Sequence, residues 1–368
     1  MARALALAAQ GLGRTHPNPA VGAVLVRGER IVGEGYHARA GEAHAEIVAL
    51  QQAGSAARGA ELYVTLEPCT HHGRTPPCVD ALLAVGLRRV VVATRDPNPR
   101  VRGRGIQRLR AAGIEVVVGP GAAQARELLA GFRSLMLAGR PLLTLKLAVT
   151  LDGRIAARGG DARWITGPEA RRLAHHLRDR HDAVLVGAGT VRADDPRLTC
   201  RSPGGRDPIR LVLVGPGLAL PHQARVLQAG GAPTWVITST AAASSRVAAL
   251  ERRGIPVIQL PPEARSGRPG FDTVARALGE RGLTSVLVEG GSTVAAEALR
   301  ARVVDRVVLF VAPRLLGGDA VPAIGTLGIT SVARALRLRD MRVARAGQDL
   351  VLTARVARSG FASSENAR

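Results

Sequence analysis

Two cysteines, a histidine and a glutamate in the first quarter of the chain are the residues best suited to chemistry. Cys69 and Cys78 lie in the stretch TLEPCTHHGRTPPC, and His44 and Glu46 lie in GEAHAEIVAL. An imidazole and two thiolates supply three ligands for Zn²⁺ and leave a fourth position open for water, as in catalytic zinc sites. Glu46 would then be placed to accept a proton from that water and to pass it to a leaving amine.

The spacing of the cysteines departs from the commonest pattern. Only Cys69, Cys78 and Cys200 are present, too few for a disulfide framework. Zinc nucleobase deaminases combine a histidine, a glutamate and a proline-cysteine step, but two residues usually separate their cysteines, and eight separate them here. The intervening loop must bulge out and return, with Pro76 and Pro77 opening a helix whose first turn holds the second cysteine. A closed structural site with a second histidine is the alternative, and the glutamate beside the ligand favours catalysis.

The length, charge and aromatic content of the chain indicate a two-domain protein and disfavour membrane and nucleic-acid-binding classes. A chain of 368 residues with 46% hydrophobic content is long enough for two domains. No stretch of eighteen uncharged apolar residues occurs, and the N-terminus turns polar too soon for a signal peptide, so we expect a cytoplasmic protein with no membrane partner. The formal charge is +22, but the arginines are dispersed and aromatic residues make up only 2% of the chain. Platforms for stacked bases are therefore scarce, and we expect no nucleic-acid partner; a basic, zinc-stabilised nucleic-acid-binding protein is the alternative.

Short β-rich runs alternate with helical segments along the whole chain, which predicts two α/β domains. The elements expected in the first part are a hairpin at 21–37, helices at 43–54 and 77–86, strands at 60–68 and 88–94, a helix and strand at 105–119, and a helix at 122–138. The second part is expected to hold strands at 142–150, 183–189, 209–215, 234–239, 255–260, 285–291 and 305–313, with helices at 167–180, 244–254, 271–282 and 292–301. The Gly-Pro stop near Arg140 marks the boundary. We therefore expect domains at 1–140 and 141–358 and a disordered tail at 359–368.

Lys146 is the single lysine among 51 basic residues. A compact ammonium can change its pKa on burial, which a guanidinium does not, so a site that cannot use arginine is one interpretation and a snorkelling strand-end lysine the other. Farther along, VLVEGGSTVAAEAL predicts a strand that turns at Gly290 and Gly291 into a helix able to hold a phosphate. By itself this turn is a weak signal, because such turns are common in α/β proteins. A second glycine turn is followed by Thr190, Asp194, Asp195 and Arg201.

The stretches THPNPAVGAVLV, GEGYH, AGEAHAE, YVTLEPCTHHGRTPPC and DPNPRVRGRG resemble the N-terminal deaminase domain of the bifunctional riboflavin-biosynthesis deaminase/reductases. In that family the eight-residue cysteine spacing is usual and the domain has a cytidine-deaminase-like α/β/α fold. The resemblance implies that His44, Cys69 and Cys78 bind zinc and that Glu46 shuttles protons. It also implies contacts to the pyrimidine or its ribose phosphate from Asn18, His37, His71 and Arg74. The alternatives are an Asx-type turn at the asparagine and solvated or strand-end histidines.

The stretches LKLAVTLDGRIA, RWITG, LVGAGTVRADDPRLT, VEGGS and APRLLGG resemble the C-terminal domain of the same family, which has a dihydrofolate-reductase-like α/β fold and uses NADPH. The resemblance implies cofactor contacts from Ala148, Trp164, Thr190, Asp194, Gly291, Ser292, Thr293, Val294, Ala295, Ala296 and Glu297. It implies substrate contacts from Ala162, Arg178, Leu198, Arg201 and Glu289. Lys146 and Asp194 would flank the reacting sugar carbon, although either acid at 194 or 195 could instead be a turn residue before Pro196. Relatives place serine at position 162 and, in some cases, at Gly215.

The resemblance thus predicts two successive reactions of riboflavin biosynthesis. The first domain would hydrolytically deaminate 2,5-diamino-6-ribosylamino-4(3H)-pyrimidinone 5′-phosphate, and the second would reduce the ribosyl chain of the product to ribityl. We expect a small phosphorylated pyrimidine as the substrate, Zn²⁺ and NADPH as cofactors, and a homo-oligomer. The alternative within enzymes is an active deaminase with a degenerate second domain.

Overall fold

The computed structural model describes residues 1–70, 76–99, 101–228, 230–264 and 266–357. The chain divides into two compact units, Met1–Pro141 with Gly279–Thr284, and Leu142–Leu278 with Ser285–Arg368. Within the described ranges, no helix has the length and apolar character needed to cross a bilayer. His71, Arg74 and the tail predicted at 359–368 lie outside the described residues.

The first unit is built on a mixed sheet, in the strand order β2-β1-β3-β4-β5 for the described part of the chain. β1 pairs antiparallel with β2 and β3, whereas β3, β4 and β5 are parallel. Parallel neighbours need a crossover, and helices supply it between each pair. The strands are β1 Gly22–Arg27, β2 Arg30–Tyr36, β3 Glu61–Val64, β4 Arg89–Val92 and β5 Glu115–Val118.

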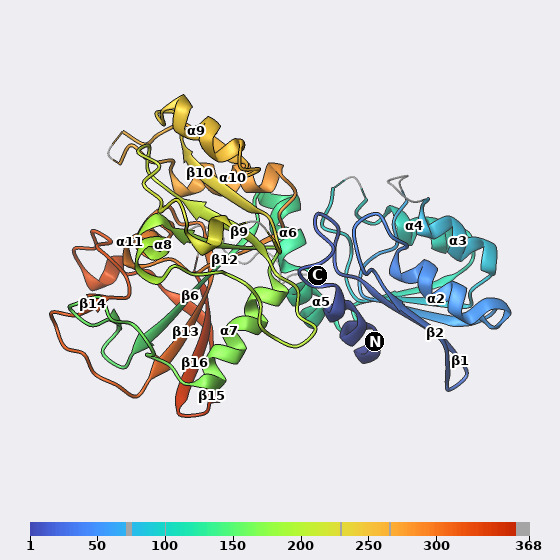
Figure 1. Ribbon diagram of the computed structural model, residues 1–368. Coiled ribbons are helices and arrows are strands. Elements are labelled where there is room, and N and C mark those ends of the chain that lie inside the picture. The colour runs from blue at the N-terminus through green and yellow to red at the C-terminus, as the bar shows by residue number, and fades with distance from the viewer. Residues whose placement is uncertain (71–75, 100, 229, 265, 358–368) are drawn as a thin grey trace. The chain divides into compact units, whose positions relative to one another are not determined.

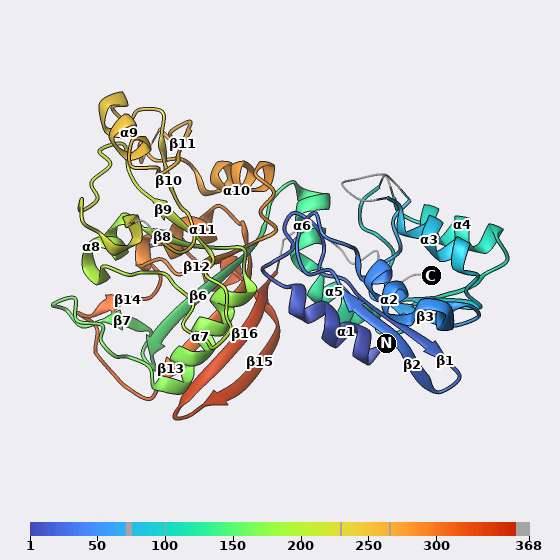
Figure 2. The ribbon, with the colours of Figure 1, turned by 45° about the vertical axis from the view of Figure 1, so that its right-hand side comes forward.

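Successive side chains of β1 point to opposite faces of this sheet, and helices pack on both faces. Ala23 and Leu25 face the core shared with α2, α3 and α4, while Val24 faces α1. The result is three layers, α/β/α, which Figures 1 and 2 show from two directions. The helices are α1 Ala2–Ala8, α2 Ala45–Ala53, α3 Cys78–Val85, α4 Arg104–Ala111, α5 Ala122–Leu128 and α6 Ala130–Ala138, with 3₁₀ turns at Ala9–Gly11 and Gly54–Ala57.

Two glycines on β2 allow α2 to approach the sheet closely. A Cβ at Gly33 would lie 2.2 Å from the Ala49 carbonyl oxygen, and a Cβ at Gly35 would lie 2.7 Å from the Ala45 carbonyl oxygen. Such distances are far below van der Waals contact, so only glycine fits at these positions. The helix that begins directly after His44 is therefore held in place by backbone-to-backbone packing.

The second unit contains a larger sheet, in the order β11-β10-β9-β8-β12-β6-β13-β16-β15 over the described residues. The strands from β11 to β13 are parallel, and β16 and β15 are antiparallel additions at one edge. A small separate sheet joins β7 Arg154–Ala156 to β14 Val321–Pro322. The main strands are β6 Leu142–Thr150, β8 Ala183–Gly187, β9 Ile209–Leu213, β10 Thr234–Ser239, β11 Val257–Leu260, β12 Ser285–Val288, β13 Val304–Ala312, β15 Leu338–Ala346 and β16 Asp349–Val356.

Helix α7 covers the β6, β13 and β16 portion of this sheet (Figure 2). Ala170, Ala174 and Leu177 of the helix pack against Val308 and Phe310 of β13. The helices of this unit are α7 Pro168–Arg180, α8 Ala188–Asp194, α9 Ser244–Glu251, α10 Phe271–Glu280 and α11 Ser292–Arg300, with 3₁₀ turns at Arg225–Leu227 and Val332–Arg334. Both units thus have the α/β architecture expected from the sequence.

Several elements differ from those expected from the sequence. The helix expected at 122–138 is two helices, because Leu129 leaves helical geometry, with ψ at 5°, and is buried in the core. The sequence analysis predicted none of α1, β7, α8, β14, β15 and β16. All but the last residue of β15 are exposed, so the strand has no buried face to mark it, and α8 is only seven residues long.

The first prediction concerns the close approach of α2. Gly35→Ala places a methyl group where the Ala45 carbonyl and the Val48 side chain already lie, so we expect a loss of about 1–3 kcal/mol in the free energy of unfolding. Denaturant unfolding measures this loss. Gly159→Ala is the matched control, because a Cβ there meets nothing within 4 Å. Equal stability of Gly35→Ala and the parent chain would contradict the packing argument.

Candidate functional site

His44, Cys69 and Cys78 come together as a compact set of donors. Their ligand atoms all lie within 4.8 Å of one another, with 3.1 Å between His44 Nδ1 and Cys78 Sγ and 3.6 Å between His44 Nδ1 and Cys69 Sγ. One nitrogen and two sulfur donors suit Zn²⁺, and three protein ligands leave one position open. The residues present therefore fit a catalytic zinc ion.

Each donor is placed by the end of a secondary-structure element. His44 is the N-cap of α2, Cys78 is the first residue of α3, and Cys69 follows β3. The backbone N–H of Cys78 donates to Cys69 Sγ at 3.3 Å. Hydrogen bonds from the Cys78 thiol and from His44 lower the pKa of Cys69 to about 4. The prolines at 76 and 77 precede α3 instead of forming its first turn.

Glu46 lies in the first turn of α2 and is 4% exposed. Burial, and after it the negative charge of Cys69, raise the pKa of its carboxyl to about 7. A bound cation would lower the pKa of this carboxyl and of both thiols. The carboxyl is therefore held beside the donor set in a dry environment.

The donor set opens into a pocket of about 380 Å³. Asn18 and His37, both predicted to contact substrate, line it and are joined by a 3.1 Å hydrogen bond between Asn18 Nδ2 and His37 Nε2. His37 Nδ1 lies 3.1 Å from the Ala43 carbonyl oxygen, and the rings of His37 and His44 meet edge to face with centroids 5.3 Å apart. The positions of His71 and Arg74 lie outside the described residues.

Glu67 is a residue that the sequence interpretation missed. Its carboxylate is 3% exposed and accepts four backbone hydrogen bonds, from Asp96 and Gly103 at Oε2 and from Gly105 and Ile106 at Oε1, at 2.9–3.3 Å. It ties the segment between β3 and Cys69 to the loop after β4 and to the first turn of α4. A Cβ at Gly105 would lie 2.3 Å from the Pro68 carbonyl oxygen, so the glycines of DPNPRVRGRG were the available signal.

The second unit gathers three of its predicted residues into a charged cluster. Arg178 donates to both oxygens of Glu289, at 2.7 and 2.9 Å, and Lys146 Nζ lies 3.7 Å from Glu289 Oε2. Burial lowers the pKa of Lys146, an effect that Glu289 opposes. Burial raises the pKa of Glu289, but Arg178 and Lys146 outweigh it and bring the value to about 2. Glu289 is therefore ionised, and Lys146 is a half-buried ammonium of increased acidity.

A pocket of about 550 Å³ contains several of the predicted cofactor residues. A Cβ built at Gly291 would lie 3.6 Å from Thr190 Oγ1, which places the start of α11 beside α8. Burial raises the pKa of Asp194 in this pocket. No hydrogen bond or ion pair joins Asp194 to Lys146 in the described part of the chain. The predicted residues lining the pocket are Ala162, Thr190, Asp194, Gly291, Ser292, Thr293 and Val294.

The other predicted residues lie around these two features. Ala295 and Ala296 are buried in α11, and Glu297 pairs with Arg268 at 2.5 Å. Leu198 is buried with φ at 56°. Ala148 lies on β6, and Trp164 is 58% exposed beneath the Arg171 guanidinium. Neither of the last two is among the residues described as lining the pocket.

His175 is a second residue missed from sequence. Its Nε2 accepts a 3.0 Å hydrogen bond from Arg201 Nε, a predicted substrate contact. Burial, followed by the charges of Arg178 and Arg201, lowers the pKa of His175 to about 4. The ring is therefore neutral near pH 7 and can accept this bond. Its place one helical turn before Arg178 was the signal in the sequence.

Comparisons with known proteins agree with both units. Residues 1–94 match the cytidine and deoxycytidylate deaminase zinc-binding region, and residues 141–352 match the RibD C-terminal domain. The riboflavin biosynthesis protein RibD of Aquifex aeolicus is 46% identical over 96% of both chains, and that of Escherichia coli is 41% identical over 96% of this chain and 97% of that one.

Two solved structures are similar over the whole chain. RibD of Acinetobacter baumannii, form 1, has a TM-score of 0.87 at 37% identity and covers 97% of this chain and 98% of that one. A deaminase/reductase of Thermotoga maritima has a TM-score of 0.85 at 37% identity and covers 97% of both chains.

The fold and the donor set define a two-part enzyme in which a zinc-dependent deaminase precedes an NADPH-dependent reductase. The chain belongs to the family of the riboflavin biosynthesis protein RibD.

The second prediction concerns Glu67. Glu67→Gln keeps the shape but replaces one carboxylate oxygen by an amide NH₂, so two of the four backbone N–H groups lose their acceptor. We expect a loss of about 1–3 kcal/mol in the free energy of unfolding. Denaturant unfolding tests this, with the exposed Glu29→Gln as the control. If both variants were equally stable, the four bonds would not be holding the loop.

Proposed function

We propose that this chain catalyses two successive steps of riboflavin biosynthesis. The first unit hydrolytically deaminates 2,5-diamino-6-ribosylamino-4(3H)-pyrimidinone 5′-phosphate, and the second reduces the ribosyl chain of the product to ribityl. The observation that carries the proposal is the set of one nitrogen and two sulfur donors within 4.8 Å, with a buried glutamate beside it, in a chain whose second part matches the RibD C-terminal domain. The two proposed domains are residues 1–140 and 141–358.

In the deaminase, His44, Cys69 and Cys78 would hold the zinc ion. When bound, zinc supplies the Lewis acidity that activates the hydrolytic water. Hydrolysis replaces the ring amine by oxygen and releases ammonia, so one proton must leave the water and one must reach the amine. Glu46 is the group that moves these protons, because it lies beside the donors and is not needed as a ligand.

Substrate binding in this unit falls to the residues that line its pocket. Asn18 and His37 hold each other by a hydrogen bond and present polar atoms to the 380 Å³ space. We propose that they orient the pyrimidine, together with His71 and Arg74 of the loop between the cysteines. The eight-residue spacing then provides a loop long enough to carry substrate contacts.

In the reductase, NADPH supplies the hydride when bound. The carbon to be reduced would be C1 of the ring-opened ribosylamine, whose imine nitrogen must gain a proton. Lys146 is half-buried beside Glu289 and is the cation proposed to lie near that nitrogen. Arg178, Arg201, Leu198, Glu289 and Ala162 are proposed to hold the ribose phosphate. Ala148, Trp164, Thr190, Asp194 and residues 291–297 are proposed to hold the cofactor.

We also propose the substrate class, the cellular location and the assembly of the enzyme. Its substrate is a small phosphorylated pyrimidine and not a nucleic acid or a membrane. Its expected location is the cytoplasm, and its expected form is a homo-oligomer. Sedimentation of the purified chain measures the assembly directly.

The third prediction assigns the proton shuttle. Glu46→Gln removes the base but leaves the three donors, so we expect zinc to be retained and deamination to fall by about 10²–10⁴-fold. Metal content by mass spectrometry and ammonia release measure the two effects. NADPH oxidation with deaminated substrate is the internal control and should persist. Retained deamination would remove Glu46 from this role.

The fourth prediction tests the role of the Lys146 ammonium. Lys146→Met keeps most of the length of the side chain and removes its charge. We expect NADPH oxidation to fall by about two orders of magnitude or more, because charge stabilisation of this kind contributes on that scale. Ammonia release from the first substrate should be unchanged. The exposed Arg158→Met serves as the control in the same unit. Unchanged NADPH oxidation in Lys146→Met would show that the cation is not used.

A further inference from the structure

The 550 Å³ pocket of the second unit has two chemically different ends. Asp194 lies toward residues 155–162, where the Arg163 guanidinium donates to its backbone carbonyl at 2.7 Å. Residues 213–219, which follow β9, line the other end together with Arg192 and Arg268. The charged groups lining the described pocket are thus one carboxylate and two guanidiniums, and the guanidiniums lie with the β9 loop.

The order of strands determines which part of a dinucleotide meets each end. Glu289 directly follows β12, and Lys146 is in the middle of β6, next to Leu145, which pairs with the last residue of β12. The proposed reacting groups therefore lie at the carboxyl end of β12 and beside it on β6. β9 is three strand positions from β6 in the order β9-β8-β12-β6. At about 4.8 Å per position, the β9 loop is roughly 14 Å from β6 across the sheet. A cofactor with its nicotinamide at the reacting groups therefore extends its adenosine half toward β9.

Three arginines from separate elements surround the β9 loop. Arg192 of α8 donates to the Ala219 carbonyl at 2.9 Å, and Arg246 of α9 donates to the Gly217 carbonyl. Arg268 lies against Gly215, since a Cβ there would be 3.7 Å from its Cγ. The guanidiniums of Arg192 and Arg246 are thus bound to the loop, and the aliphatic part of the Arg268 side chain lies beside it.

The charges of this cluster are only partly neutralised. Arg268 pairs with Glu297 at 2.5 Å, whereas Arg192 and Arg246 have no acidic partner among the described residues. Sites selective for NAD carry a carboxylate that accepts the ribose 2′-hydroxyl. The β9 end of this pocket has no carboxylate among the residues described as lining it. Its excess positive charge suits a phosphomonoester, which carries a charge of about −1.5 to −2 at pH 7 and is matched by planar guanidinium forks.

We propose that Arg192, Arg246 and Arg268 form the subsite for the 2′-phosphate and make the reductase select NADPH over NADH. The proposal rests on the proposed function of the second unit and adds the residues that set its cofactor specificity. Arg192 and Arg246 are exposed, so their replacement by alanine leaves the core intact. Arg268→Ala also removes the ion-pair partner of Glu297, so its effect is compared with those of the Arg192 and Arg246 variants.

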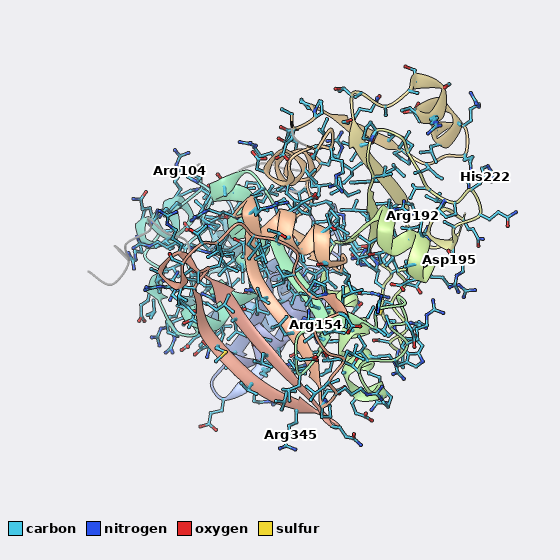
Figure 3. All side chains as sticks on the ribbon, turned by 90° about the vertical axis from the view of Figure 1, so that its left-hand side faces the viewer. Arg104, Arg154, Arg192, Asp195, His222 and Arg345 are labelled. Carbon is cyan, nitrogen blue, oxygen red and sulfur yellow. The ribbon has the colours of Figure 1, made fainter. Side chains whose placement is uncertain are left out.

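Isothermal titration calorimetry of the full chain with 2′,5′-ADP and with 5′-AMP tests the subsite apart from catalysis, because the two probes differ only in the 2′-phosphate. Arg345→Ala is the matched control. Arg345 is an exposed arginine of β15, and Figure 3 places it far from Arg192 in the same unit. Titration with NADPH and NADH completes the set.

We expect the parent chain to bind 2′,5′-ADP at least tenfold more tightly than 5′-AMP. Arg192→Ala, Arg246→Ala and Arg268→Ala should each weaken 2′,5′-ADP and NADPH binding at least tenfold while changing 5′-AMP and NADH binding less than twofold. Arg345→Ala should change none of them. Equal weakening of both probes, or no change in either, would overturn the subsite. A parent chain that binds NADPH without preferring 2′,5′-ADP also overturns it and leaves the reductase function standing. A parent chain that binds no NADPH overturns the reductase function itself.

Discussion

The first active site depends on one constraint: three soft donor atoms must meet within 4.8 Å although they come from segments far apart in the chain. The fold meets it by bringing the starts of α2 and α3 to the end of β3. His44 then lies at a helix N-cap and Cys78 at a helix start, while Cys69 receives an N–H from the helix that begins at Cys78. Positive partial charge at that helix end stabilises the thiolate before any metal is bound.

The surrounding structure serves to keep this meeting point rigid. Gly33 and Gly35 let α2 lie directly on β2, and Glu67 holds the loop after β4 against the segment that carries Cys69. A buried carboxylate costs several kcal/mol unless its oxygens are satisfied. Four backbone donors satisfy Glu67, so the carboxylate can remain in the interior and fasten a loop that also lines the pocket.

In the second unit, a carboxylate is stabilised by cations instead of backbone N–H groups. Glu289 is also buried, but it is balanced by two cations, a bidentate arginine and the single lysine of the chain. Two cations against one carboxylate leave a net positive charge where a phosphorylated substrate is proposed to bind. His175 stays neutral between Arg178 and Arg201 and can therefore orient one of them without adding to the repulsion. Arg178 and Arg201, two of the many arginines that raise the net charge of the chain, thus have specific partners in this unit.

The sequence by itself determined the residue types that can do chemistry and most of the regular elements. His44, Glu46, Cys69 and Cys78 were recognisable because few residue types bind zinc, and the strands were recognisable because buried parallel strands are continuous apolar runs. Tertiary structure alone decided which side chains face one another. In the sequence, Glu67 resembles an ordinary loop acid, and only the fold brings backbone N–H groups of residues 96–106 to its carboxylate. His175 likewise resembles a surface histidine, and only the fold places the Arg201 side chain, from beyond the next strand, against its ring. Local sequence sets backbone preferences, whereas hydrogen bonds between distant segments depend on the packed arrangement of the sheet and its helices.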